Sequence, residues 1–513
     1  MTMKRKTNIL IYTLMGLFYL ASCSDSLTDK NINPLEPAET NPKYLLPTAQ
    51  SIIMGHVFNN DVNSNITMIN AQYFSQTDYA DESNWNFREG MLSSYTSGFY
   101  DAIKQLDEIR RLLDLAEEGA YSKEELASWN LVLTTLETYC YQNITDVNGP
   151  AVYSEAMDIK RPTPKYDSQK DIYSSLLENL SQAIQACDGT VNIKTGEQDM
   201  IYSGDISKWQ KFANSMLLRC AMRVIERPEL NSAKYIAIAR DTKNGGLINS
   251  NNDIAGLKYL DSPSGNQMYE SSYNNSSLPL VASNTIYDLQ EKLNDPRIDL
   301  YWENPWGDNG GLNFGSTGSW WSYSCINQSI IGWKNKYNAG ASWADRPTAN
   351  FPGIFIDKAE VDFFLSEAAV RGVISDIDAT QAYNDGIKAS IEFYANFTDP
   401  SLDLSDEIES YIAGELVNLN LASSPEDKLE RIGEQKWLAL WLQGAEGWTE
   451  IRRLDSPKLN RPSNPVSTVS DFPTRLKFSS REKDINSANV KKAIEMMGQS
   501  EDLYTTKLWW DIK

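Results

Sequence analysis

The chain has 513 residues, of which 41% are hydrophobic and 23% are charged, so its composition is that of an ordinary globular protein with a large core. Its 69 acidic residues exceed its 47 basic residues and give a formal charge of -22 at pH 7. Because so acidic a surface repels phosphate backbones, we expect no nucleic acid among its partners.

The amino-terminal segment resembles a bacterial lipoprotein signal. A short basic start precedes an apolar run over residues 9–20, which is too short to span a bilayer comfortably. The run leads into Leu20-Ala21-Ser22-Cys23, which resembles a lipobox and implies cleavage before Cys23 and lipidation of that cysteine. Residues 1–22 are therefore predicted to be a signal peptide, with a plain secretory signal as the alternative.

Residues 23–42 are predicted to be the lipidated cysteine followed by a flexible tether. The stretch 24–42 is polar and carries several proline and acidic residues, so it cannot bury enough apolar surface to fold alone. Its 19 residues could reach about 60–70 Å when extended. Since no second run of about 18 apolar residues follows, we expect a lipid anchor and no membrane-spanning helix.

From about residue 43 the hydrophobic pattern is helical. Ile172, Leu176, Leu180 and Ile184 recur at the four-residue steps that one face of an amphipathic helix requires. Another helix, with Trp209 and Met216 on its apolar face, is predicted to begin after Asp205 or Ser207 as its N-cap. Further helices are predicted at 96–117, 123–142, 232–242, 283–293, 358–372, 378–396, 405–417 and 428–445.

Two of these segments form a predicted helix pair closed by small residues. Ala368 and Gly372 belong to the first helix and Gly386 to the second, with Asp376 or Asp378 as the cap between them. Small residues let helices approach closely, as in tetratricopeptide hairpins. The predicted fold class is therefore mostly α: one domain over 43–513, a tetratricopeptide-like helical-hairpin scaffold (α-solenoid) decorated with long irregular loops.

The stretch from about 245 to 357 is predicted to be a loop-rich insertion. It is rich in glycine, serine and asparagine but also carries several tryptophans, so it is not a simple linker. Loops of this length without secondary structure are uncommon in compact domains unless they are functional. We therefore expect loops that pack on the helices and build a surface. The chain after Arg452 is predicted to be mostly irregular as well.

The inventory of reactive side chains favours binding over catalysis. The single histidine, His56, rules out the histidine-rich metal motifs, and no phosphate-binding or dinucleotide-binding glycine loop is present, so we expect no metal and no cofactor. Cys140, Cys187 and Cys220 fall at apolar helical positions. Together with Cys325 they could pair in three ways, and no CxxC motif is present.

Paired carboxylates leave one enzymatic alternative open, a surface glycoside hydrolase. Glu446 and Glu450 lie one helical turn apart, although ion pairs with Arg452 or Arg453 are the favoured use. Asp403 and its acidic neighbours could hold calcium, but a helix cap is favoured there. A third hypothesis is a scaffold that only grips a barrel partner and has no ligand of its own.

Several segments, in order along the chain, resemble proteins of the SusD/RagB family, in the branch often called SusD-like. They are Asp146-Val-Asn-Gly-Pro-Ala-Val-Tyr-Ser-Glu-Ala156 with the stretch 164–173, the stretch 204–219, the stretch 360–372, Gln435-Lys-Trp-Leu-Ala-Leu-Trp441, and Glu446-Gly-Trp-Thr-Glu-Ile-Arg-Arg453. The resemblance implies a helical body with tetratricopeptide-like repeats on the outer face of the outer membrane. It also implies a non-catalytic lid that passes glycans, or in some members peptides, to a SusC-like TonB-dependent barrel.

These segments are predicted to be scaffold, because their tryptophans lie on apolar helical faces and their arginines are placed to pair with acidic neighbours. The ligand surface must come from other residues. Sugar binding needs an exposed flat aromatic ring with amide or carboxylate groups beside it, and two loops supply both. The candidate ligand-binding residues are Tyr79, Asp81, Asn84 and Trp85 in the first loop, and Trp306, Trp320, Trp321 and Tyr323 in the second.

Overall fold

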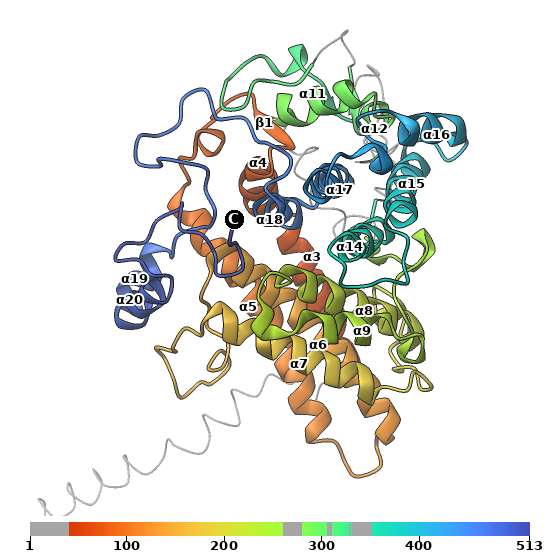
Figure 1. Ribbon diagram of the computed structural model, residues 1–513. Coiled ribbons are helices and arrows are strands. Elements are labelled where there is room, and N and C mark those ends of the chain that lie inside the picture. Colours follow the sequence, from red (N-terminus) through yellow and green to blue (C-terminus); the bar gives the residue numbers. More distant parts are fainter. Residues whose placement is uncertain (1–40, 260–279, 305–309, 328–329, 331–350) are drawn as a thin grey trace, which may run out of the picture. The chain divides into compact units, whose positions relative to one another are not determined.

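The computed structural model describes residues 41–259, 280–304, 310–327, 330 and 351–513 (Figure 1). The predicted signal peptide, Cys23, nearly all of the tether and Trp306 lie outside the described residues. Residues Lys43–Lys513 form one compact unit. Among the described residues, no helix is both long enough and apolar enough to cross a membrane.

This unit is mostly helical, which confirms the predicted fold class. The first helices are α3 (Pro42–Val57), a π-helical turn (Asn60–Thr67), α4 (Met68–Asn70), α5 (Glu89–Asp114), α6 (Lys123–Asn148), α7 (Gln169–Ala186), α8 (Ile206–Arg223) and α9 (Ser232–Arg240). They are followed by α11 (Asn284–Leu293), α12 (Arg297–Tyr301), α14 (Lys358–Val370), α15 (Ala379–Thr398), α16 (Ser405–Ala413), α17 (Pro425–Ala439), α18 (Gly444–Leu454), α19 (Ser480–Ile485) and α20 (Ser487–Met496). Helices that follow one another in sequence lie side by side as antiparallel pairs, notably α5 to α9 and α14 with α15 (Figure 1).

The helix pair α14–α15 shows why small residues were needed there. A Cβ atom added to Gly386 of α15 would lie 3.1 Å from the ring of Phe363 in α14, which is tighter than an ordinary contact. Ser366 Oγ donates to the carbonyl of Ala379 at 2.7 Å and fixes the beginning of the second helix. The prediction of a close hairpin is confirmed.

The helix caps explain where several helices begin. Asp205 caps α8 by accepting from the backbone N–H of Ser207 at 3.0 Å, and Asp378 caps α15 by accepting from that of Thr380 at 2.8 Å. Asp376, the other candidate cap, pairs with Arg240 instead. Asp403 accepts from the N–H of Ser405 at 3.1 Å, but it precedes Leu404, the N-cap residue of α16, which has no side-chain cap bond.

Within the described residues, three two-stranded antiparallel sheets pair segments that are separated in sequence. β1 (Phe74–Gln76) pairs with β3 (Leu280–Ala282), with Ser75 opposite Val281. β2 (Ala255–Leu257) pairs with β6 (Gly353–Ile356), and β4 (Trp302–Glu303) pairs with β5 (Cys325–Ile326). The stretch that was predicted to be loop-rich thus contributes one strand of the first sheet and both strands of the other two, and the first sheet pairs it with β1.

The predicted helix 428–445 is wrong at its carboxyl end. The chain leaves the helix after Ala439, turns with Leu442 at a positive φ of 70°, and begins α18 at Gly444. A Cβ atom on Gly444 would lie 2.5 Å from the backbone nitrogen of Met68. The break therefore allows α18 to pack directly against the backbone of α4. Sequence analysis also missed the short helices α19 and α20.

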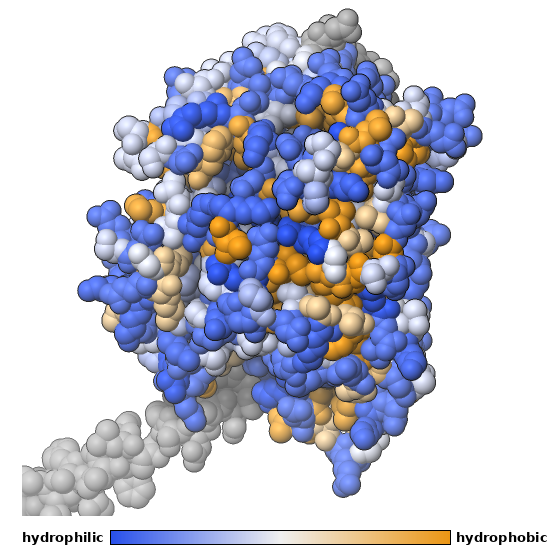
Figure 2. Space-filling model, viewed as in Figure 1, coloured by the Kyte–Doolittle hydropathy of each residue, from blue (hydrophilic) through white to orange (hydrophobic). Residues whose placement is uncertain are grey.

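The face of the protein drawn in Figure 2 is mainly hydrophilic, with apolar side chains showing at its centre and right. The interior holds Cys140, Cys187, Cys220 and Cys325, which are all buried and free. Burial raises the pKa of the Cys140 thiol well above its usual value, so it behaves as a small apolar group.

Candidate ligand-binding surface

The loop after β1 is held from beneath by a buried carboxylate. Glu82, 1% exposed, accepts from Nε2 of Gln76 at 2.9 Å and from Nε of Arg88 at 2.5 Å. Gln76 in turn accepts from the backbone N–H of Ser83 at 3.1 Å. Because these bonds fix the short turn Glu82–Asn84, the residues around it are presented on a rigid support.

Asn84 joins the two loops that sequence analysis selected. Its amide Nδ2 donates to the carbonyls of Ala80 and Gly315, both at 2.8 Å, and its Oδ1 accepts from the N–H of Asn464 at 3.0 Å. The N–H of Gly318 donates to the carbonyl of Thr77 at 3.0 Å, which adds a second tie. The two loops are far apart in sequence but lie together, and the amide of Asn84 is used to hold them.

The joined loops carry exposed aromatic side chains. Tyr79 is 87% exposed and adopts a positive φ of 52°, while Trp321 is 53% exposed. Trp320 packs edge-to-face on Trp321, with ring centroids 5.9 Å apart, and rests on the small apolar cluster around Leu312. Tyr323 is half-buried against Gly318, where an added Cβ would lie 2.7 Å from the ring. Of the adjacent tryptophans, one therefore packs inward and the other faces solvent.

Two of the candidate residues have different surroundings. Asp81 is exposed and accepts from Nδ2 of Asn86 at 2.9 Å. Trp85 is only 2% exposed and packs edge-to-face on Phe472 at 5.4 Å, so its ring is not part of the outer surface. The guanidinium of Arg461 lies 5.3 Å above the Trp85 ring. The exposed rim, which we define as Tyr79, Asp81, Trp320, Trp321 and Tyr323, lacks Trp85.

Trp85 instead lines a cavity of about 250 Å³, together with aromatic residues that sequence analysis did not connect with it. Its walls come from chain segments that begin at Asn70 and end at Asp511, so no local pattern could have indicated it. The lining residues are Asn70, Gln72, Trp85, Phe314, Trp448, Ile451, Arg452, Asp455, Pro457, Lys458, Leu459, Phe472, Pro473, Thr474, Lys507 and Asp511.

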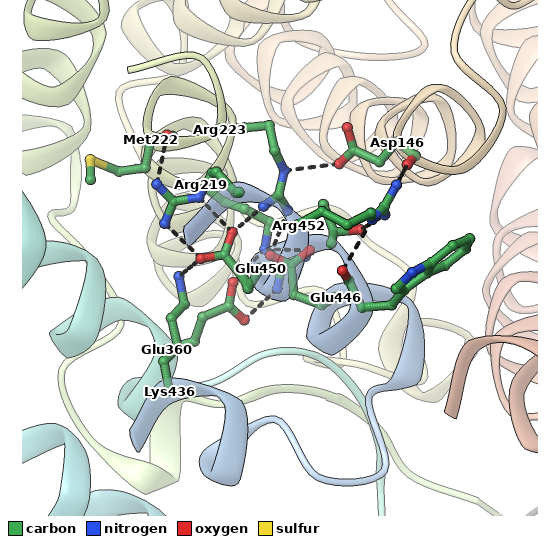
Figure 3. A network of polar contacts seen from close by, with 12 residues as sticks. Asp146, Arg219, Met222, Arg223, Glu360, Lys436, Glu446, Glu450 and Arg452 are labelled. Atoms are coloured by element: carbon green, nitrogen blue, oxygen red, sulfur yellow. Dashed lines mark hydrogen bonds and ion pairs between the residues drawn. The ribbon is translucent and has the colours of Figure 1, made fainter. Parts of the chain in front are cut away.

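The segments that carried the resemblance meet in a buried network of ion pairs (Figure 3). Arg223 of α8 contacts Asp146 of α6 at 3.0 Å and Glu446 of α18 at 2.6 Å, and it also pairs with Glu450. Arg219 pairs with Glu360 at 2.6 Å. These contacts connect α6, α8, α14 and α18, so the ion-paired residues of these segments hold the helices together.

Glu450 lies at the centre of this network. It accepts from Lys436 at 2.7 Å and from Arg453 at 2.6 Å, besides Arg223. Burial opposes its charge, but the three cations hold the pKa of this carboxyl well below its usual value. Arg453 also pairs with Glu367 at 2.5 Å.

The residues considered for catalysis are used in packing. Glu450 is buried, Glu446 is partly buried, and both are ion-paired. Glu450 pairs with Arg453, as expected, but Glu446 pairs with Arg223 and not with Arg452 or Arg453. His56 is buried, and its Nε2 lies 2.7 Å from the carbonyl oxygen of Tyr95. Within the described part of the chain, no group of three His, Cys, Asp or Glu residues is placed to hold a metal.

Together, these features define a helical-hairpin scaffold that presents a rigid, aromatic-bearing loop surface. A family model for SusD-like proteins, described as "Starch-binding associating with outer membrane", matches residues 34–479. The chain therefore belongs to the SusD-like family, an outer-membrane-associated family of carbohydrate-binding proteins that are generally not enzymes. No curated protein matches the chain in sequence.

Solved structures share the fold. A SusD-like protein from Bacteroidetes, AC2a, is 22% identical with a TM-score of 0.78, and the match covers 92% of this chain and 100% of that one. A SusD homologue from Bacteroides uniformis is 22% identical with a TM-score of 0.74 and the same coverage. A chitin-binding SusD homologue from Flavobacterium johnsoniae is 21% identical with a TM-score of 0.73, covering 91% of this chain and 99% of that one.

Proposed function

We propose that this protein is a surface-exposed nutrient-binding lipoprotein that captures oligosaccharides, with peptides as the other ligand class, and delivers them to a SusC-like TonB-dependent barrel without changing them. The lipid on Cys23 would anchor it to the outer membrane, with the body facing the exterior. The single observation that carries the proposal is the exposed rim, on which solvent-facing Tyr79 and Trp321 stand on loops fixed by Asn84.

The chemistry of the rim suits sugar capture. A flat ring offers an apolar face to a pyranose, and the exposed carboxylate of Asp81 can accept hydrogen bonds from hydroxyl groups. The fixed loops reduce the entropy that would be lost on binding. The chitin-binding homologue of the same fold makes a glycan the first ligand class to test.

The proposal is tested by binding of the purified protein to oligosaccharide and peptide pools. We expect retention without new products in the glycan pool, and each of Tyr79→Ala and Trp321→Ala should weaken binding about five- to ten-fold, since one stacked aromatic contributes about 1 kcal/mol. Tyr44→Ala removes another exposed tyrosine, 56% exposed on α3, and is the matched control. Release of shortened sugars would support the hydrolase alternative instead.

The partner is tested separately, in the outer membrane of the producing bacterium. We expect the protein to be labelled with lipid at Cys23 and to co-purify with a TonB-dependent barrel, and we expect Cys23→Ser to abolish lipid labelling and release the protein from the membrane. Co-purification with a barrel while every ligand pool fails would favour the hypothesis of a scaffold without a ligand.

A further inference from the structure

The cavity beside Trp85 has an unusual charge for this protein. Arg452, Lys458 and Lys507 line it together with Asp455 and Asp511, so basic side chains outnumber acidic ones in a chain whose net charge is -22. The cavity of about 250 Å³ is smaller than the ~300–1,000 Å³ typical of drug-sized ligands, so it suits one ring with a substituent.

Arg452 is the buried cation of this cavity, and its charge is not neutralised by contact. Its guanidinium donates to the carbonyls of Trp448, Asp146 and Thr474 and to the hydroxyl of Thr449, at 3.1, 2.7, 2.7 and 2.7 Å. All four acceptors are neutral, and among the described residues no carboxylate lies within 4.0 Å of it. Its neighbour in sequence, Arg453, in contrast has two carboxylate partners.

The guanidinium also keeps one free donor. Four of its five N–H groups are used, and the second N–H on Nη2 has no acceptor within the described residues. Burial lowers the pKa of Arg452 to about 10, although the carboxylates of Asp146 and Asp511 act in the opposite direction. A negative group in the cavity would relieve the penalty of burial.

Four aromatic residues, Trp85, Phe314, Trp448 and Phe472, contribute to the remaining walls. Trp448 lies beneath the guanidinium, 4.2 Å from ring centroid to Cζ, and Trp85 and Phe472 meet edge-to-face at 5.4 Å. Apolar surface also comes from Phe314, Ile451, Pro457, Leu459 and Pro473. Such walls stack on a flat apolar face.

We propose that this cavity binds a ring-sized organic acid, with its carboxylate facing Arg452 and its ring against Phe472 and Trp85. Two sources share this chemistry, an acidic sugar unit of a glycan and the terminal aromatic residue of a peptide. The proposal adds a ligand class to the proposed function. It rests on the proposed function only where it names a glycan or a peptide as the source of the acid.

The test is calorimetric titration of the purified protein with two matched pairs of small ligands. The first pair is glucuronic acid and glucose, and the second is N-acetylphenylalanine and its amide. We expect the acid of at least one pair to bind at least ten-fold more tightly than its neutral partner, since a charge-assisted hydrogen bond contributes about 1.5–3 kcal/mol. Discrimination in the sugar pair alone identifies a glycan source, and discrimination in the other pair alone identifies a peptide source.

Variants at the exposed edge locate the site without disturbing the buried arginine. We expect Phe472→Ala to weaken binding of the acid about five- to ten-fold and Lys507→Gln about two- to five-fold. Lys492→Gln removes an exposed lysine of α20 that does not line the cavity, and it should leave binding unchanged.

Equal affinity for acid and neutral ligand, no binding of any ligand, or binding that neither Phe472→Ala nor Lys507→Gln changes would overturn the proposal. The small acids are titrated without any oligosaccharide, so the titration result does not depend on whether the exposed rim binds sugar.

Discussion

In the buried ion network, we expect the loss of a carboxylate to lower the free energy of unfolding more than the loss of a cation. Glu450 accepts from Arg223, Lys436 and Arg453, whereas Lys436 has Glu450 as its one carboxylate partner within 4.0 Å among the described residues. Lys436 is fully buried and lies over the ring of Phe364, with Nζ 3.0 Å from the centroid. The change Glu450→Gln would therefore leave three buried cations with less compensation, and Lys436 with no carboxylate within 4.0 Å among the described residues.

The magnitude follows from the cost of an uncompensated buried charge. Removing one partner of a buried pair costs about 3–5 kcal/mol, so we expect Glu450→Gln to lower the free energy of unfolding by that amount. With an entropy of unfolding of about 2.1 cal/mol/K per residue, a body of this length gives about 1 kcal/mol/K, and the melting temperature should fall by about 3–5 °C.

Lys436→Met is the informative partner variant. It removes a buried cation, retains an apolar chain over Phe364, and leaves Glu450 with two arginines, so we expect a cost of about 1 kcal/mol or less. Urea unfolding followed by circular dichroism measures both values. Glu392→Gln, in the exposed pair with Lys388 on α15, is the control and should leave the midpoint unchanged. If Lys436→Met is as destabilising as Glu450→Gln, the reasoning from uncompensated charge is refuted.

Three further predictions concern pH, the loops and helix packing. Burial raises the pKa of Glu434 to about 7, above its unfolded value, so its contribution to stability is present at low pH and is lost as pH rises through about 7. In urea melts from pH 5 to 8, Glu434→Gln should flatten this decline in stability, and an unchanged slope would contradict the assignment. Asn84→Ala removes the hydrogen bonds that join the two loops, so it should lower stability by about 1–3 kcal/mol and weaken ligand binding. The control Asn86→Ala loses one exposed hydrogen bond and should change neither stability nor binding. Comparable losses in both variants would show that contacts other than those of Asn84 hold the loops. Gly447→Ala would place a Cβ atom 2.3 Å from the hydroxyl of Tyr73 and should destabilise the protein by about 1–3 kcal/mol. Gly90→Ala, with no atom within 4 Å of the added Cβ, should be neutral or stabilising in thermal melts. Equal effects of the two variants would mean that the packing around Gly447 adapts.

The sequence alone determined the elements whose causes are local. The spacing of apolar residues predicted most of the helices, because one turn of helix repeats every 3.6 residues whatever it packs against. Asp205 and Asp378 were each one of two predicted caps, because a cap bonds to N–H groups two or three residues away. Gly386 indicated a close helix pair because a helical residue without a side chain lets a neighbouring helix approach closely.

Only the tertiary structure decided which aromatic rings are exposed and which line a cavity. Trp85 and Trp321 occupy similar polar loops in sequence, yet one is 2% exposed and the other 53%, because Phe472 and Arg461 from the distant carboxyl-terminal segment cover the first. The break at Leu442 is likewise set by the approach of α18 to α4. The cavity of Arg452 draws its lining from Asn70 to Asp511, and contacts between residues so far apart leave no trace in local composition or periodicity.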